Sequence, residues 1–356
     1  MRKEKYILWM CTLLLASTAS AQTEVTTGIM RGKDYGVTYM LPKTEIELTL
    51  QVTKHTYTPG EFCKYAGRYL RLNRVSAESQ TYWTLDKIEM RTVGVPDKEN
   101  VYFVKMKDKS SAPLMELTED GIVRSINVPF SGTKTAPAPV KVSNKEESKP
   151  DPHSFLTEEI LMATSRAKMA ELVAREIYNI RESKNALLRG EADNTPKDGV
   201  QLKIMIDNLN LQERVLTEMF AGVHETAAET ITLRLTPQEV QNEVAFRFSK
   251  KLGVVAKDDL AGEPYYISIT DLKTPEVQPT AEEDGKKKLE GVVYNVPGRA
   301  RIILSHNNEE LYNTELPVTQ FGTKEFLAAV LFNKNSTIQV TFDTATGGLL
   351  KVDRGE

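Results

Sequence analysis

A seven-residue pattern that occurs twice is the feature that most constrains the fold of this chain. Residues 36–42 read GVTYMLP and residues 291–297 read GVVYNVP, and an apolar strand pattern follows each copy. About thirty residues after each copy comes an aromatic residue near a glycine: YAG at 65–67 and FG at 321–322. A similar turn follows later in each half: TEDGIV at 118–123 and TATGGL at 344–349. Three matches in the same order favour two related β modules. The alternative is that the pattern recurs by chance, because strand sequences are repetitive.

The first 21 residues have the pattern of a secretory signal peptide. A basic start (Arg2, Lys3) precedes a short apolar core, and Ala19-Ser20-Ala21 is a small-x-small cleavage site. The core is too short to span a bilayer stably, and no later stretch is long and apolar enough to do so. We therefore expect cleavage between Ala21 and Gln22, no transmembrane segment, and a periplasmic or outer-envelope location that includes peripheral attachment to the envelope.

The rest of the chain divides into four segments. Residues 22–130 and 223–356 alternate apolar and polar side chains over short stretches, which predicts an N-terminal β module and a C-terminal β-sandwich module. Residues 131–153 are rich in Pro, Ser, Thr and charged residues, which predicts a disordered linker. Residues 154–222 have helical periodicity. The predicted fold class is α+β, with two mainly antiparallel β modules flanking a long antiparallel α-helical hairpin.

The hairpin is the most specific part of this prediction. Thr157 is placed to cap a helix of about thirty residues that ends at Gly190, a length of roughly 45–50 Å. A second helix ends at Gly222, and its seam is made of heptad-spaced apolar residues with one polar member: Leu202, Met205, Leu209, Gln212, Leu216 and Met219. Two amphipathic helices joined by a short loop pack antiparallel.

No residue group predicts catalysis, cofactor binding or a metal site. The four histidines (His55, His153, His224 and His306) have no His, Cys or carboxylate partner at metal-ligand spacing. The loop at 191–199 lacks the alternating oxygen ligands of a calcium loop. Cleavage leaves Cys63 alone, which excludes an intrachain disulfide, and we expect it to be a small buried side chain. Tyr82 and Trp83 lie in a strand pattern and are expected to pack in the core.

The charge pattern argues against nucleic acid as a partner. The chain carries 46 Lys and Arg against 49 Asp and Glu, a formal net charge of −3. The basic residues are scattered along the sequence, whereas phosphate binding requires a concentrated basic face.

Several segments together resemble a known kind of protein. They are residues 36–42, 65–70, 177–183, 189–193, 246–249 and 320–322. In these segments the chain is similar to an exported Bacteroidota family of unknown function, of the DUF4831 type. The resemblance covers nearly the whole chain after the signal peptide, and it implies an envelope location in a Gram-negative cell. It implies no catalytic residues.

Two functional hypotheses follow. The first is a non-enzymatic exported envelope protein that uses the helical hairpin to bind a protein partner or a second copy of itself. The alternative is a polysaccharide-binding or polysaccharide-processing protein with its site between the β modules, because clefts between domains are favoured places for pockets. A cleft with paired carboxylates and stacked aromatic residues would favour the second hypothesis, and a filled interface would favour the first.

Overall fold

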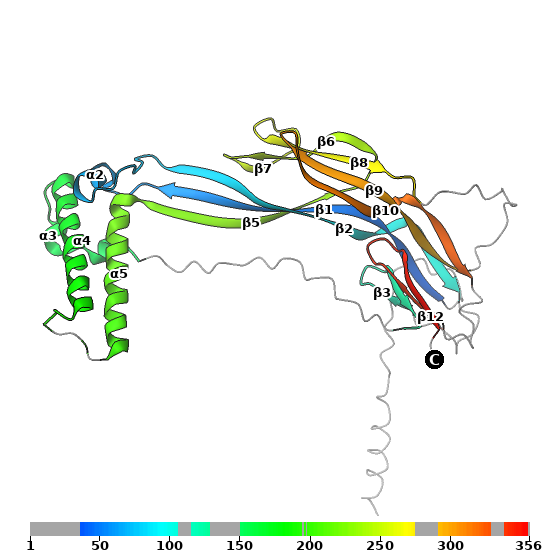
Figure 1. The fold of residues 1–356 in the computed structure, drawn as a ribbon, viewed down its shortest axis with the longest axis horizontal. Helices are drawn as coiled ribbons and strands as arrows, with labels where there is room; N and C mark the ends of the chain where they lie inside the picture. The colour runs from blue at the N-terminus through cyan, green and yellow to red at the C-terminus, as the bar shows by residue number, and fades with distance from the viewer. Residues whose placement is uncertain are drawn as a thin grey trace, which may run out of the picture.

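The computed structural model describes residues 36–105, 115–128, 150–193, 196, 198–274, 291–328 and 338–354. In this part of the chain the fold is α+β and the sheets are mainly antiparallel, as predicted. The molecule is elongated: most strands gather at one end, the helices lie at the other, and three long strands connect the two ends (Figure 1). The predicted signal peptide with its cleavage site, and residues 131–149 of the predicted linker, lie outside the described residues.

Three sheets contain the described strands. Sheet A has the order β2-β1-β5 and comprises β1 (Gly36–Thr58), β2 (Gln80–Lys105) and β5 (Val223–Leu235). Sheet C has the order β10-β9-β8-β6-β7 and comprises β6 (Val240–Ser249), β7 (Gly253–Val255), β8 (Glu263–Asp271), β9 (Gly291–His306) and β10 (Glu309–Ala328). Sheet B has the order β12-β11-β4-β3 and comprises β3 (Met115–Leu117), β4 (Val123–Ile126), β11 (Ile338–Phe342) and β12 (Leu349–Arg354).

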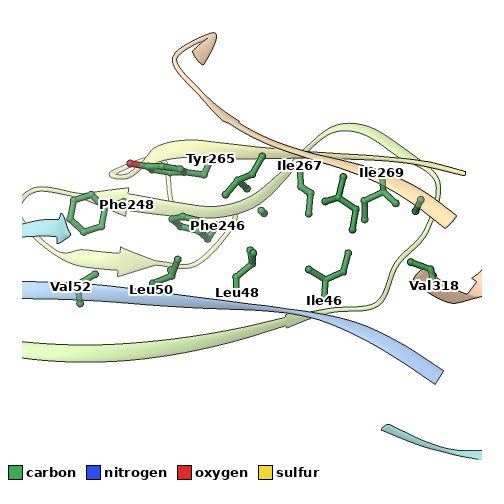
Figure 2. Packing of buried hydrophobic residues seen from close by; sticks show 14 residues of the cluster. Ile46, Leu48, Leu50, Val52, Phe246, Phe248, Tyr265, Ile267, Ile269 and Val318 are labelled. Atoms are coloured by element: carbon green, nitrogen blue, oxygen red, sulfur yellow. The ribbon is translucent and has the colours of Figure 1, made fainter. Parts of the chain in front are cut away.

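Sheets A and C pack face to face around the main core. In β1, alternate residues from Ile46 to Val52 point toward sheet C, as their period of two predicts. They meet the side chains of Phe246, Phe248 and Ile267 from sheet C (Figure 2). Each large aliphatic side chain buried here stabilises the fold by about 1.5–3 kcal/mol. The sandwich core is therefore built jointly by β1 and strands that follow it by almost 200 residues.

The strand pairing joins the two segments that we predicted as separate β modules. β5 pairs along β1 from Ile46 opposite Leu235 to Thr58 opposite Val223. β11 pairs with β4 in the same way within sheet B. An alternating pattern reveals that one face of a strand is buried, but it does not reveal which strand lies beside it. The described residues therefore form interleaved sheets with a shared core, in place of two independent modules at either side of the helices.

The repeated pattern corresponds to a repeated structural unit. Each copy starts the first strand of a long hairpin (β1 with β2, β9 with β10). Near the proline of each copy the pairing register is interrupted, and four residues of the second strand have no paired partner: 97–100 in one hairpin and 319–322 in the other. The fifth position of each copy also donates its backbone N–H to the glycine of the matching turn: Met40 to Gly121 (2.9 Å) and Asn295 to Gly347 (3.2 Å). Both glycines have a positive φ, +82° and +70°. The two copies of the pattern therefore occupy equivalent positions in their hairpins.

The two copies lie against each other. The Tyr39 hydroxyl accepts a hydrogen bond from the Val293 N–H (2.8 Å) and donates one to the Val293 carbonyl (3.0 Å). The Asn295 amide donates to the carbonyls of Pro42 (2.9 Å) and Thr346 (2.8 Å). One proposed match is wrong, however: residues 65–67 belong to short helical turns, whereas Phe321-Gly322 lie in β10.

The helical segment differs from the single long hairpin that we predicted. It contains η2 (Pro152–Phe155), α3 (Glu158–Leu161), α4 (Arg166–Arg189) and α5 (Gly199–Ala221), and η1 (Cys63–Tyr65) and α2 (Ala66–Tyr69) pack beside them. The thirty-residue helix is interrupted after α3, and the Ser165 side chain caps α4 by accepting the Lys168 N–H (3.2 Å). Thr157 makes no such capping bond. α4 ends at Gly190 (φ +71°) as predicted, and its 24 residues span about 36 Å.

Candidate interaction site at the helix pair

The helices are fixed to the far end of sheet A. Figure 1 shows β1, β2 and β5 running from the sandwich to α2, α4 and α5. At this junction Phe62, directly before η1, and Phe220 of α5 are both fully buried, with ring centroids 5.4 Å apart. The Phe62 N–H also donates to the Met219 carbonyl (2.7 Å). These residues belong to a helical core that also buries Ala170, Val173 and Ile177 of α4.

A polar bridge connects α4 with α5 further along the pair. The Glu213 carboxylate accepts hydrogen bonds from Lys184 Nζ (2.6 Å) and Arg181 Nε (2.6 Å). Burial opposes the ionisation of Glu213, but the hydrogen bonds and charges of these two cations outweigh it. The pKa of this carboxyl therefore lies below its ordinary value of 4.5. The bridge thus adds a charged contact between the two helices, and on α5 it lies between Leu209 and Leu216 of the helical core.

The predicted seam of α5 is buried only near sheet A. Leu216 and Met219 are buried, as the heptad spacing predicts, whereas Leu209, Leu202 and Gln212 are half-buried. Met205 is 40% exposed, so the prediction that it fills the seam is wrong. Helix periodicity identifies a common face, but that face is covered only as far as neighbouring elements reach.

The outer end of the helix pair exposes apolar side chains. This tip face consists of Leu188 of α4 and Val200, Ile204 and Met205 of α5, which are 64%, 65%, 56% and 40% exposed. In Figure 1 the last turn of α4 and the first turn of α5 lie at the end remote from sheet A. A concentration of exposed apolar side chains marks an interaction surface more often than isolated ones do. The sequence pattern showed these apolar residues, but it could not show that they stay uncovered.

The histidines lie at four separate places. His55 stacks on Tyr82 (4.6 Å between ring centroids) and His306 stacks on Tyr265 (4.0 Å). His224 lies against Tyr57, and His153 is 4.0 Å from Glu61. Within the described residues no three His, Cys, Asp or Glu side chains come together as metal ligands. Each histidine thus has a local structural partner.

The other residues singled out in the sequence divide between core and surface. Trp83 packs against the sandwich core, as predicted, whereas Tyr82 is half exposed and lies outside it. Cys63 is partly buried, less completely than we expected. In the loop at 191–199, Asn194, Thr195 and Lys197 lie outside the described residues, and Asp198 caps α5 by accepting the Val200 N–H (3.1 Å).

The space expected for a polysaccharide site is occupied. The facing surfaces of sheets A and C are filled by the apolar cluster of the core (Figure 2). A shallow cavity of about 530 Å³ does lie over sheet A, and Glu47 and Glu89 are among its lining residues. Both carboxylates are neutralised, Glu47 by Arg91 and Arg234 and Glu89 by Lys87. This arrangement gives no free acid–base pair.

The fold and the site together define a class: an elongated, interleaved β-sandwich whose central sheet carries a helix pair with an apolar tip. A model of the family described as "Domain of unknown function (DUF4831)" matches residues 35–350, so the chain belongs to that family. Neither the curated proteins nor the solved structures gave a significant match. Among the described helices, none combines the length and the apolar character needed to cross a bilayer.

Proposed function

We propose that this protein is an exported, non-enzymatic protein of the cell envelope, and that its helix pair associates with a second copy of the chain. The observation that carries the proposal is the tip face, where Leu188, Val200, Ile204 and Met205 are exposed at the end of the molecule remote from the sandwich. The signal-peptide pattern of residues 1–21 supports export.

The charges around the tip face favour a second copy over an unrelated partner. Lys203 and Asp207 form an exposed i,i+4 ion pair (2.7 Å), and helical spacing places this pair on the side of α5 that also carries Val200 and Ile204. If two copies of α5 pack antiparallel through the side that carries Val200 and Ile204, with the two-fold axis midway between Lys203 and Asp207, then Lys203 of each copy faces Asp207 of the other. A contact of this kind is isologous, because one patch is complementary to itself. Arg189 and Glu191 form a second exposed ion pair (3.9 Å) at the outer end of α4.

The burial of apolar surface supplies the driving force. Each large aliphatic side chain removed from water contributes about 1.5–3 kcal/mol, and the two-fold axis doubles every contact. The exposed charges at the rim add little affinity, but they fix the antiparallel register, since a parallel arrangement would place like charges together.

The test is the oligomeric state of the protein that lacks residues 1–21. Sedimentation velocity and light scattering over a concentration series should show a monomer–dimer equilibrium for the wild type. Ile204→Asp should shift it to monomer, because the charge would be buried without a partner in the dimer. Leu252→Asp is the matched control: Leu252 is also 56% exposed but lies in the turn between β6 and β7, so its variant should dimerise normally.

Two outcomes would contradict the self-association. One is a wild type that remains monomeric throughout the series, and the other is a dimer that Ile204→Asp leaves intact. Equal melting temperatures of the two variants would show that the substitutions act on association rather than on folding. Export is tested separately: mass spectrometry of an envelope extract should find a mature chain that starts at Gln22, and an intact Met1 would overturn this part of the proposal.

A further inference from the structure

A cavity lies where sheet A meets the helices, separate from the tip face. It is open to solvent, and its volume of about 660 Å³ is large enough for a small molecule. Four parts of the chain form it: the end of β1, the loop that follows α2, the start of β2, and the junction of α5 with β5. Segments far apart in the sequence therefore converge on one space.

The polar lining of this cavity is cationic. It comprises Arg71, Asn73, Arg74, Ser76, Gln80 and His224. None of the ten lining residues is an aspartate or a glutamate. Among the residues that the structure describes, no carboxylate lies within ion-pairing distance of Arg71 or Arg74. Elsewhere, arginines such as Arg91, Arg181, Arg234 and Arg301 form ion pairs with glutamates of the sheets or of the helix pair. The two guanidinium groups are available to an anion from outside.

The backbone holds both arginines in an unusual conformation. Arg71 has a φ of +58° and Arg74 a φ of +87°, in the left-handed region that side chains other than Gly, Asn and Asp seldom adopt. A loop selected only for stability would favour Gly or Asn at these two positions. Outliers of this kind concentrate at ligand sites, where the strain is retained because the side chain is needed.

The walls beside the arginines are rigid. The Tyr57 hydroxyl is 2.9 Å from the Ser76 carbonyl and 3.1 Å from the Ala221 carbonyl, so it ties the loop to the end of α5. The His224 ring lies 4.7 Å from the Tyr57 ring. Gly222 has a φ of +80°, and a Cβ there would come within 2.5 Å of the Thr58 carbonyl, so only glycine permits this close approach. The exposed side chains of Arg71 and Arg74 thus lie beside a preformed space that is open to solvent.

We propose that this cavity binds the phosphate group of a small organic phosphate, held by Arg71 and Arg74 with Gln80 and His224 beside them. Guanidinium groups match phosphate oxygens with two parallel hydrogen bonds, and the amide and hydroxyl groups of Asn73, Gln80 and Ser76 supply further polar contacts. The cavity is far larger than a free phosphate ion needs, and Leu72, Val75 and Ala221 give it an apolar side for the organic part.

The experiment is calorimetric titration of the protein lacking residues 1–21 with glucose 1-phosphate, inorganic phosphate and glucose at constant ionic strength. Glucose 1-phosphate should bind, and glucose should not. The double variant Arg71→Asn/Arg74→Asn should bind at least tenfold more weakly, because Asn tolerates a positive φ and keeps the loop while removing both charges. Arg68→Asn is the matched control: Arg68 lies in α2, stacked on Tyr69 and outside the cavity, so its variant should bind like the wild type.

The outcomes separate the proposal from simpler explanations. Unchanged affinity in the double variant, or no binding of glucose 1-phosphate, overturns the site. Equal affinity for inorganic phosphate overturns the claim that the ligand is organic. If the double variant has a lower melting temperature than the wild type, the titration is repeated with the single variant Arg74→Asn, which changes one exposed residue. This variant should also bind glucose 1-phosphate more weakly than the wild type. The oligomeric state of each variant is measured in parallel, so failure of this site is distinguishable from failure of self-association.

Discussion

A single carboxylate, that of Glu47, is hydrogen-bonded to side chains on both neighbouring strands of sheet A. Glu47 lies on the central strand β1 and is only 3% exposed. It accepts hydrogen bonds from Arg91 of β2 (2.7 Å from Nε) and from Arg234 of β5 (3.2 Å from Nε). Both arginines keep about half of their surface in water. The ionised Glu47 is therefore satisfied from both neighbouring strands, while its partners retain solvation of their own.

Glu47→Gln should destabilise the protein by about 2 kcal/mol, because hydrogen bonds to charged groups contribute more than neutral ones and Gln can replace only one acceptor oxygen. Urea unfolding monitored by circular dichroism measures the change. Glu89→Gln, which loses an exposed pair with Lys87 on the same sheet, should stay within about 0.5 kcal/mol of the wild type. Equal losses in the two variants would contradict a special role for Glu47.

Among single residues, those with a local signal were predictable and those with distant partners were not. Gly190 and Gly222 were identified as helix ends because the signal is local: a glycine directly follows the apolar period. The burial of Glu47 was not foreseeable. Its position in an alternating strand predicts a solvated side chain, and its partner Arg234 follows it by 187 positions. The cationic cavity was missed for the same reason, since Arg71 and His224 meet only through the pairing of β1 with β5.

At the scale of elements, the bridge from Lys184 and Arg181 to Glu213 should make the helix pair sensitive to acid. The pKa of Glu213 is lowered in the folded protein, so folding favours its ionised form. The resulting stability is fully present above the ordinary pKa of 4.5 and is lost as the pH falls through the lower, folded value. At neutral pH the bridge therefore contributes its full stabilisation, and in acid this stabilisation is lost.

Glu213→Gln should therefore lower the free energy of unfolding by about 1–2 kcal/mol at pH 7, and the difference from the wild type should shrink as the pH falls below 4.5. Unfolding in urea at a series of pH values between neutral and strongly acidic solution measures it. Glu182→Gln, an exposed substitution on α4, serves as the control. A difference that is constant across the whole range would show that lost packing, rather than the charge of Glu213, is responsible.

The helices also show which structural features a sequence pattern can predict. The existence and the ends of α4 and α5 followed from apolar spacing and glycine, which are properties of the helix itself. The interruption between α3 and α4 was missed because Ala163 continues the apolar spacing, while Ser165 marks a new cap. The prediction that Met205 fills the seam failed because nothing in a heptad reveals how far the neighbouring helix core extends.

On the scale of the whole molecule, two apolar clusters share no residue although continuous strands connect them. The sandwich core uses β1, β6, β8, β9 and β10, whereas the helical core uses the segment around η1 and α2 and the helices from α3 to α5. The alternating pattern predicted the strands of the first cluster. It could not assign them to sheets A, B and C, because long-range pairing depends on which buried faces meet rather than on local sequence.

This separation predicts two units that open independently. Phe220→Ala should cost about 3–5 kcal/mol and Leu304→Ala about 2–5 kcal/mol, since both side chains are fully buried. In hydrogen exchange followed by mass spectrometry, Phe220→Ala should accelerate exchange in α2, α4 and α5 and leave β8 and β9 protected. Leu304→Ala should do the reverse. If either variant accelerates exchange equally in both regions, the strands of sheet A couple the two cores into one cooperative unit. The helix pair could then not act as an element that associates or binds a ligand without disturbing the sandwich.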